Sequence, residues 1–121
     1  MAGSYKDLTA WQKGVALAKE MYHFTKSFPI EEIDGLTQMM RRTAVQVPCK
    51  IVAAHALASE KLLYNNLCKS EMLLVELETQ VEIACELDFC TRDQKSDIMA
   101  LILTEQRLVG NLLVKVSRKS K

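Results

Sequence analysis

The sequence predicts an all-α protein that folds as one antiparallel up-down-up-down four-helix bundle. Only four glycines and two prolines interrupt the 121 residues, and these are the residue types that most often break helices. Apolar side chains recur every three or four residues in four successive segments, which is the spacing of amphipathic helices. Short polar connections separate the segments, so neighbouring helices should run antiparallel around a shared core.

Residues 1–121 are expected to form a single domain. Hydrophobic residues make up 49% of the chain and charged residues 26%, which is the composition of a globular domain and not of a disordered one. No apolar run approaches the roughly 18 residues that a membrane span requires, and the first residues do not resemble a signal peptide. We therefore expect a cytoplasmic protein that does not associate with membranes.

The first helix is expected over residues 8–28, with two apolar rows that together form a wide buried stripe. One row consists of Leu8, Trp11, Val15, Ala18, Tyr22 and Thr25, and the other consists of Leu17, Met21, Phe24 and Phe28. Asp7 is placed where a carboxylate could cap the first free amides. Pro29 should end the helix, because the residue before a proline disfavours the helical conformation.

The second helix should begin near Asp34. Pro48 lies inside its apolar pattern, where it removes one backbone hydrogen bond, so we expect a kink or a short break near Val47. In the third segment, apolar or small residues alternate in steps of four and three from Leu63 to Ala84. This pattern predicts the longest helix of the protein.

The fourth helix should begin at a capping box. Thr91 and Gln94 are spaced so that each side chain can satisfy a free backbone amide at the helix start. The apolar face that follows includes one acidic residue, Glu105. The helix is expected to fray at its C-terminal end, where residues 115–121 form a short basic tail.

Charges of opposite sign are segregated along the chain, although the net charge is only +1. Residues 35–69 carry a net charge of +4 and residues 98–121 also carry +4, whereas residues 70–97 carry −6. One interpretation is that helices of opposite sign neutralise one another within the bundle or between subunits. The other is that a basic surface remains for a polyanion such as RNA.

Seven basic residues are the candidates for contacts with nucleic acid. They are Arg41, Arg42, Lys50, Lys115, Arg118, Lys119 and Lys121. Arg41 and Arg42 point about 100° apart on a helix, so we expect at least one to pair with an acidic residue of the third helix. Recognition would rely on phosphates and shape. Trp11 and Tyr22 could stack on bases, but their place in the apolar row favours packing in the core.

The third and fourth helices carry more apolar residues than one core stripe needs. The surplus residues are Met72, Leu73, Leu103 and Val114. An isolated bundle would expose them to water, and exposed apolar rows usually mark a subunit interface. We therefore expect a homo-oligomer whose interface includes these four side chains.

The sequence offers no set of residues typical of an enzyme. His23 and His55 have no nucleophile or carboxylate partner in sequence, and neither a Glu-x-x-His motif nor a glycine-rich phosphate loop is present. The cysteines are Cys49, Cys68, Cys85 and Cys90. In a domain of this size without a secretory signal, we expect reduced thiols that pack as small apolar side chains. Because the cysteines form no Cys-x-x-Cys pair, we expect no metal, and no cofactor is expected either.

Several short motifs, taken in order, resemble those of a bacterial protein family. They are Asp7-Leu8-Thr9-Ala10-Trp11-Gln12-Lys13, Phe28-Pro29, Gly35-Leu36-Thr37, Arg41-Arg42, Ala44-Val45, Pro48, Ile51 and Glu76-Leu77-Glu78-Thr79-Gln80. Over nearly its whole length the chain is similar to the 23S ribosomal RNA intervening-sequence proteins. It is also similar to the accessory variability determinant (Avd) proteins of diversity-generating retroelements.

The resemblance implies a non-enzymatic four-helix bundle that assembles into a ring-like homopentamer with basic surfaces suited to nucleic acid. The paired arginines of the family correspond to Arg41 and Arg42, and its helix-breaking proline corresponds to Pro48. In the retroelement branch, such a ring would partner a reverse transcriptase and its template RNA.

Two functions therefore remain open at the level of sequence. The first is a non-catalytic oligomer that binds RNA or a ribonucleoprotein through its basic residues. The second is a protein-interaction scaffold, in which the acidic third helix and the apolar rows dock a partner protein and nucleic acid plays no role.

Overall fold

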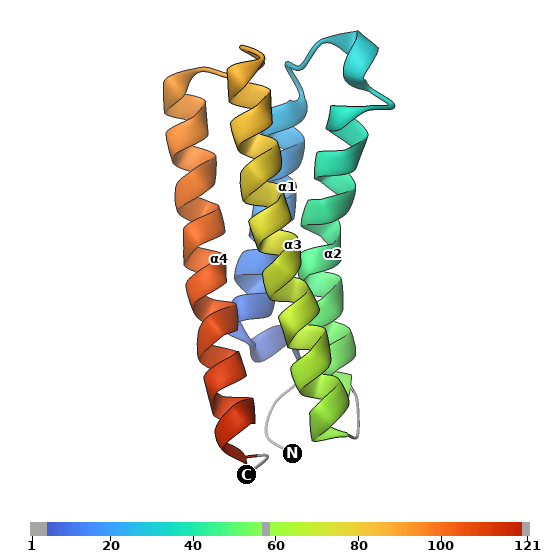
Figure 1. Cartoon of the computed structure of the whole chain (residues 1–121), viewed down its shortest axis with the longest axis vertical. Helices are drawn as coiled ribbons and strands as arrows, with labels where there is room; N and C mark the ends of the chain where they lie inside the picture. Colours follow the sequence, from blue (N-terminus) through green and yellow to red (C-terminus); the bar gives the residue numbers. More distant parts are fainter. Residues whose placement is uncertain (1–4, 57–58, 120–121) are drawn as a thin grey trace.

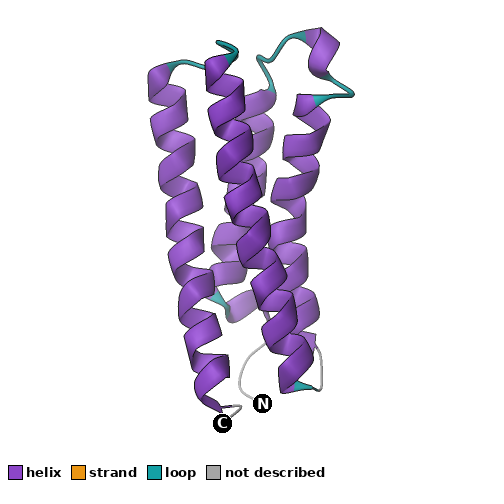
Figure 2. Ribbon diagram, viewed as in Figure 1, coloured by secondary structure: helices purple, strands orange, loops and turns teal. Residues whose placement is uncertain are grey.

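The computed structural model describes residues 5–56 and 59–119, and every regular element in these ranges is helical. The four long helices are α1 (Thr9–Thr25), α2 (Leu36–Ala56), α3 (Glu60–Glu86) and α4 (Arg92–Lys119), with short 3-10 helices η1 (Tyr5–Asp7) before α1 and η2 (Ile30–Glu32) before α2. Figure 1 shows the long helices side by side, alternating in direction, with the start of α1 and the end of α4 at one end of the bundle. The predicted four-helix bundle is confirmed, and Figure 2 shows that only short loops connect the helices.

Each helix packs mainly against two neighbours. The main contacts are α1 with α2, α2 with α3, α3 with α4, and α4 back with α1, so the helices follow one another around a common core. The core contains apolar side chains from all four helices, including Met21, Met40, Leu77 and Ile102, none of which is exposed. No helix of the described ranges has an apolar stretch that could cross a membrane.

The two apolar rows of α1 are not equally buried. Leu17, Met21 and Phe24 lie in the core, as predicted. In the other row Thr25 is buried and Leu8, Trp11 and Ala18 are partly buried, whereas Val15 and Tyr22 are 43% and 46% exposed. The expectation of burial is therefore wrong for Val15 and Tyr22, because α1 packs mainly against α2 and α4 and leaves these two side chains at the outer edge of its contact with α2.

Both ends of α1 differ from the prediction. Asp7 belongs to η1 and is not the N-cap, because Leu8 occupies that position and no side chain caps the helix there. The helix ends at Thr25, four residues before Pro29. The Thr25 hydroxyl donates a 2.9 Å hydrogen bond to the Met21 carbonyl. After Thr25 the Lys26 amide donates to the carbonyl of His23, three residues back, so the helix closes in a tighter turn before it reaches the proline.

The helix α2 continues through Pro48 without the break that the sequence predicts. It begins at Leu36, whose amide donates to the Glu32 carboxylate over 3.2 Å. Around Pro48 the helix is supported by its neighbours, because Ser70 of α3 donates to the carbonyl of Val47 over 3.2 Å and the proline ring packs against Gly14 of α1. The carbonyl that loses its donor is that of Ala44, four residues before the proline. The tertiary contacts therefore stabilise this part of α2 without replacing that hydrogen bond.

The turn between α3 and α4 confirms the predicted capping box. The Thr91 amide donates to the Gln94 side chain over 2.8 Å, and the Gln94 amide donates to the Thr91 hydroxyl over 3.1 Å. Asp88 turns the chain with a φ of 60°. The helix that follows is the longest, with 28 residues against 27 in α3, so the prediction that α3 is longest is wrong by one residue.

The same turn corrects the expectation that all four cysteines are reduced. Cys85 and Cys90 form a disulfide, with their Cα atoms 5.4 Å apart, whereas Cys49 and Cys68 are free. The bond joins the last turn of α3 to the residues just before α4. Sequence spacing did not indicate this pair, because the reversal of the chain at Asp88 brings the two residues together.

The core contains one acidic side chain that has no polar partner. Glu105 is fully buried, and neither of its carboxylate oxygens accepts or donates a hydrogen bond. A Cβ atom placed on Gly14 would lie 2.7 Å from Glu105 Oε2, so the carboxyl group reaches across the core to α1. Burial raises the pKa of Glu105 from 4.5 to about 8, and the side chain is therefore protonated in the folded protein at neutral pH.

We predict that stability falls as the pH rises from 5 to 8. In this range the folded protein keeps the Glu105 proton while the unfolded chain has lost it, since the pKa is about 8 in the fold and 4.5 in its absence. The unfolded state then binds fewer protons, and the free energy of unfolding should decrease by up to ~1.4 kcal/mol per pH unit. Above pH 8 it should level off. Urea denaturation at several pH values measures this dependence.

The variant Glu105→Gln should flatten this pH dependence, because the amide has a similar shape but does not ionise. Glu76→Gln is the matched control, since Glu76 is exposed on α3. If the two variants and the unmodified protein show parallel curves of unfolding free energy against pH, the assignment of a neutral Glu105 is wrong.

Candidate nucleic-acid interface

Arg41 is held against α1 by three contacts. Its Nε donates to the Thr25 hydroxyl over 2.8 Å, and its Nη2 donates to the Tyr22 carbonyl over 3.5 Å. The guanidinium also lies over the Tyr22 ring, 4.6 Å from the ring centroid. These acceptors belong to the last turn of α1, where backbone carbonyls lack partners within the helix. The arginine therefore ties α2 to the end of α1.

The expected salt bridge between the arginine pair and α3 is absent. Within the described ranges, neither Arg41 nor Arg42 lies within ion-pair distance of a carboxylate, and the ion pair found there joins Lys95 to Glu82 over 2.8 Å. The reason is directional, because position 41 of α2 faces α1 and not α3. Arg42 is exposed.

Both arginines nevertheless line the same pocket. It has a volume of about 390 Å³ and lies on the side of the bundle where α2 meets the end of α1. Its lining consists of Tyr22, Ile33, Thr37, Gln38, Arg41, Arg42, Val45 and Gln46. None of these side chains is acidic, so the two guanidinium groups give the pocket a positive potential. We refer to it as the arginine pocket.

The side chains of the arginine pocket suit a nucleic acid. A guanidinium can bind a phosphate through two parallel hydrogen bonds, and the amides of Gln38 and Gln46 can both donate to and accept from base edges. Tyr22 is nearly half exposed and adds an aromatic surface. Because Arg41 is already fixed by α1, it requires little ordering when a ligand binds.

Sequence reasoning found the two arginines but missed their neutral neighbours. Gln38, Arg42 and Gln46 are spaced four residues apart, which places them in a row along one side of α2. That spacing was the available signal for Gln38 and Gln46, and counting charges could not reveal it. Tyr22 was assigned to the core, and the structure places it in the arginine pocket instead.

The other predicted basic residues are not brought to this pocket. Lys50 is half-buried further along α2, and Lys115 is exposed near the end of α4. Figure 1 shows that α4 ends at the opposite end of the bundle from the start of α2. Arg118 and Lys119 belong to the last turn of α4, and Lys121 lies outside the described residues. The basic tail is thus separate from the arginine pocket.

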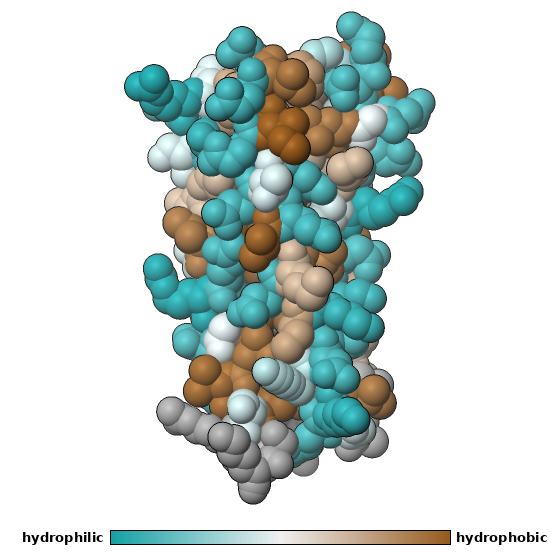
Figure 3. Space-filling view, in the orientation of Figure 1, coloured by the Kyte–Doolittle hydropathy of each residue, from teal (hydrophilic) through white to brown (hydrophobic). Residues whose placement is uncertain are grey.

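Three of the four predicted interface residues are exposed. Met72 is 64% exposed, and Leu103 and Val114 are also open to solvent, whereas Leu73 is half-buried and packs against the core. In the view of Figure 3, apolar side chains interrupt the hydrophilic surface at several heights along the bundle.

An apolar groove that the sequence did not predict runs between α1 and α2. Its volume is about 470 Å³, and it is lined by Trp11, Val15, Ala18, Val45, Pro48, Cys49, Val52 and Ala53. It shares Val45 with the arginine pocket. The α1 row that contains Val15 thus forms one wall of this groove.

A metal centre finds no support in the part of the chain that the structure describes. No three side chains of the types His, Cys, Asp and Glu come together there in a way that could hold a metal ion.

We predict that Arg41 stabilises the fold and that Arg42 does not. Arg41→Ala removes charge-assisted hydrogen bonds and a cation–π contact, so it should lower the free energy of unfolding by about 1.5 kcal/mol. Arg42→Ala, at an exposed position without a hydrogen bond or ion pair, should change it by less than about 0.5 kcal/mol. Urea denaturation of both variants measures the difference, and equal effects would contradict the assigned contacts.

Comparison with known proteins places the chain in a family. No curated protein sequence matches it. Residues 6–111 match the family model described as 23S rRNA-intervening sequence protein, a range that includes the arginine pocket and most of the bundle. The chain belongs to the 23S rRNA-intervening sequence protein family.

Proposed function

We propose that the protein is a non-catalytic RNA-binding protein associated with ribosomal RNA, and that the arginine pocket is its principal contact. The description of the family points to ribosomal RNA as the partner. The observation that carries the proposal is the pocket itself, in which two arginines, two glutamines and a tyrosine meet without an acidic side chain.

The two arginines have different roles in this proposal. Arg41 is fixed over Tyr22 and provides a positioned positive charge, while the exposed Arg42 is free to turn towards a phosphate. The glutamine amides can contact the edges of a base next to that phosphate. Such edges are accessible in single-stranded loops and bulges, because the deep major groove of an RNA duplex excludes side chains. We therefore expect a preference for unpaired RNA.

The basic end of α4 is a second RNA contact in the proposal. Lys115, Arg118, Lys119 and Lys121 lie close together in sequence near the C-terminus. They would bind phosphates without reading sequence. Because this tail and the arginine pocket are at opposite ends of the bundle, one RNA would have to follow its length to reach both.

We also propose that the protein forms a homo-oligomeric ring, which the family resemblance suggests is a homopentamer. One candidate surface is the apolar groove between α1 and α2, and the other is the exposed apolar row with Met72, Leu103 and Val114 on α3 and α4. These surfaces differ, so contact between them is head to tail and can close into a ring. A ring would also present several arginine pockets to one RNA and raise its avidity.

The most specific form of the proposal is a retroelement accessory protein. In this form the cytoplasmic ring would hold a reverse transcriptase and its template RNA. The alternative is a protein-interaction scaffold without a nucleic-acid role, which is favoured by the apolar groove and by the strong exposure of Met72. Binding measurements with RNA separate the two functions.

We predict that Arg42→Ala weakens binding to a labelled single-stranded fragment of 23S rRNA by about tenfold, because it removes a charge-assisted contact. Fluorescence anisotropy at low salt measures this affinity. Arg107→Ala is the matched control, since Arg107 is an exposed arginine of α4 outside the arginine pocket. The affinity of the unmodified protein should also fall about twentyfold between 50 and 200 mM salt, for roughly three phosphate contacts.

Equal effects of Arg42→Ala and Arg107→Ala would show that the arginine pocket is not the site. Charge reversal at Lys115, Arg118, Lys119 and Lys121 tests the tail separately, and it should weaken RNA binding without changing assembly. If the protein does not bind RNA at either salt concentration, the scaffold alternative replaces the proposal.

We predict that Val15→Glu in the groove and Met72→Glu on α3 each abolish assembly, because each places a charge in an apolar contact. Light scattering should then report monomers for either variant alone. Mixed together, the two variants still share one intact pair of complementary surfaces and should form heterodimers. Leu87→Glu, at an exposed position in the turn after α3, is the control. A mixture that stays monomeric would contradict the head-to-tail arrangement.

A further inference from the structure

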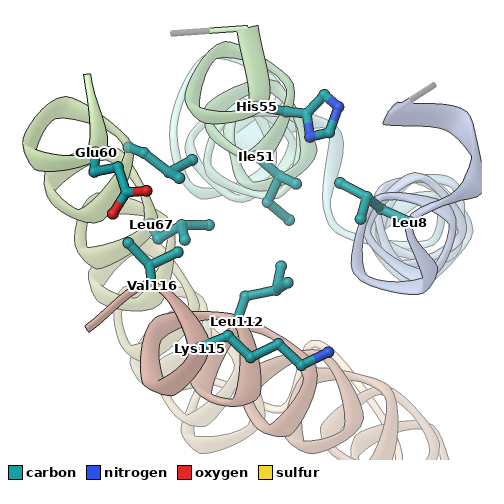
Figure 4. Close-up of a pocket in the computed structure, with 9 residues that line it drawn as sticks. Leu8, Ile51, His55, Glu60, Leu67, Leu112, Lys115 and Val116 are labelled. Atoms are coloured by element: carbon teal, nitrogen blue, oxygen red, sulfur yellow. The ribbon is translucent and has the colours of Figure 1, made fainter. Parts of the chain in front are cut away.

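A cavity between the four helices opens at the end of the bundle where α4 terminates. Its volume is about 220 Å³, and its lining comes from the start of α1 and from α2, α3 and α4 (Figure 4). The lining residues are Leu8, Ile51, His55, Glu60, Leu63, Leu67, Leu112, Lys115 and Val116. We refer to it as the end cavity. It lies far from the arginine pocket, and Lys115 is the residue it shares with the proposed RNA contact at the basic end of α4.

The walls of the end cavity are hydrocarbon. Ile51, Leu67 and Val116 belong to the buried core, and the three remaining leucines are partly buried and pack against it. Side chains that border an empty space lose the dispersion contacts that a neighbour would provide. An aliphatic chain of matching size would restore these contacts and would be removed from water at the same time.

The end cavity continues towards a second hollow between α1 and α4. This hollow has a volume of about 280 Å³, and it shares Leu8, Leu112 and Lys115 with the end cavity. Lys115 thus borders both spaces. The end cavity alone is smaller than the roughly 300–1,000 Å³ of sites for drug-sized ligands, so its occupant should be short.

Two nitrogen groups at the rim of the end cavity favour an anion. The Nε2 atom of His55 is shielded from water and has no hydrogen-bond partner, which is an uncommon and costly state for a buried polar atom. In Figure 4, the side chains of His55 and Lys115 extend towards the side of Leu8, whereas Glu60 lies on the opposite side. Both side chains line the end cavity.

The position of Glu60 has a separate explanation. It lies in the first turn of α3, directly after the N-cap Ser59, where the helix dipole favours an acidic side chain. His55 lies in the last turn of α2, where the helix dipole favours a basic side chain. Its Nε2 atom nevertheless has no hydrogen-bond partner.

We propose that the end cavity binds a short aliphatic carboxylate. The alkyl chain would lie among the leucine, isoleucine and valine side chains. The carboxylate would lie on the Leu8 side, where it accepts hydrogen bonds from Lys115 Nζ and from a proton on His55 Nε2. An alkylamine of equal length would lack both interactions and would meet the positive charge of Lys115.

Octanoate is the probe for this site, titrated into the full-length protein by calorimetry and followed by methyl NMR. We expect saturable binding of one octanoate per chain, with shifts at the methyl groups of Ile51, Leu67 and Val116 and none at Val15 and Val52 of the apolar groove. Octanol, which has the same chain but no charge, should bind about tenfold more weakly.

Variants of the lining residues test which side chains bind the carboxylate and which surround the alkyl chain. Lys115→Gln should weaken octanoate binding about tenfold and remove the preference over octanol. Lys69→Gln, at an exposed lysine of α3 outside the end cavity, is the matched control and should change nothing. Glu60→Gln should leave binding intact or tighten it. Leu63→Phe should fill the cavity and abolish binding, with circular dichroism to verify the helical fold.

Three results would overturn the proposal. The first is a lack of saturable octanoate binding at millimolar concentration. The second is an equal response of Lys115→Gln and Lys69→Gln. The third is a set of methyl shifts confined to Val15 and Val52, which would place the alkyl chain in the groove between α1 and α2. Because no RNA is present in these experiments, their outcome is independent of the proposed RNA binding.

Discussion

The close approach of α1 and α2 at Gly14 is the constraint on which the rest of the structure depends. A Cβ atom at position 14 would lie 3.2 Å from Pro48 Cβ and 2.7 Å from Glu105 Oε2, so a larger residue would displace the Glu105 carboxyl group and press on the proline ring. This contact supports α2 where proline removes a backbone hydrogen bond. It also brings the end of α1 next to Arg41. The arginine pocket and the apolar groove are both formed by the two helices that meet there.

The sequence predicts the positions of the helices well, but it predicts poorly which side chains of a helix contact the other helices. Periodicity identifies all four helices, and the capping box at Thr91 places the start of α4 correctly, because both signals are local. The choice between the two apolar rows of α1 is not local. Either row could form a core, and only the positions of α2 and α4 decide that Tyr22 faces outward. Likewise, Pro48 considered alone predicts a kink or a short break, whereas α2 continues through it in contact with Gly14.

The candidate site shows the same division. Charge and family resemblance indicated Arg41 and Arg42, but they could not separate a structural arginine from a free one. The structure separates them at the end of α1, where the Thr25 hydroxyl and the Tyr22 carbonyl accept hydrogen bonds from Arg41. Arg42 is exposed to solvent. Gln38 and Gln46 carry no charge, so they become candidates only when the structure places them beside the arginines. The basic tail, which the sequence treated as the same kind of site, lies at the other end of the bundle.

The segregated charges form few ion pairs between the helices of the described ranges. Residues 70–97 carry a net charge of −6, yet the ion pair found within the described ranges joins Lys95 to Glu82, both of which belong to that segment. The first interpretation of the charge pattern, neutralisation between helices of one bundle, therefore has little support from side-chain contacts. Neutralisation between molecules is consistent with the proposed head-to-tail contact. There the α1–α2 side of one subunit, which includes most of the basic segment, would face the acidic α3 of the next. Charge would then orient the subunits, and the apolar groove would provide most of the affinity.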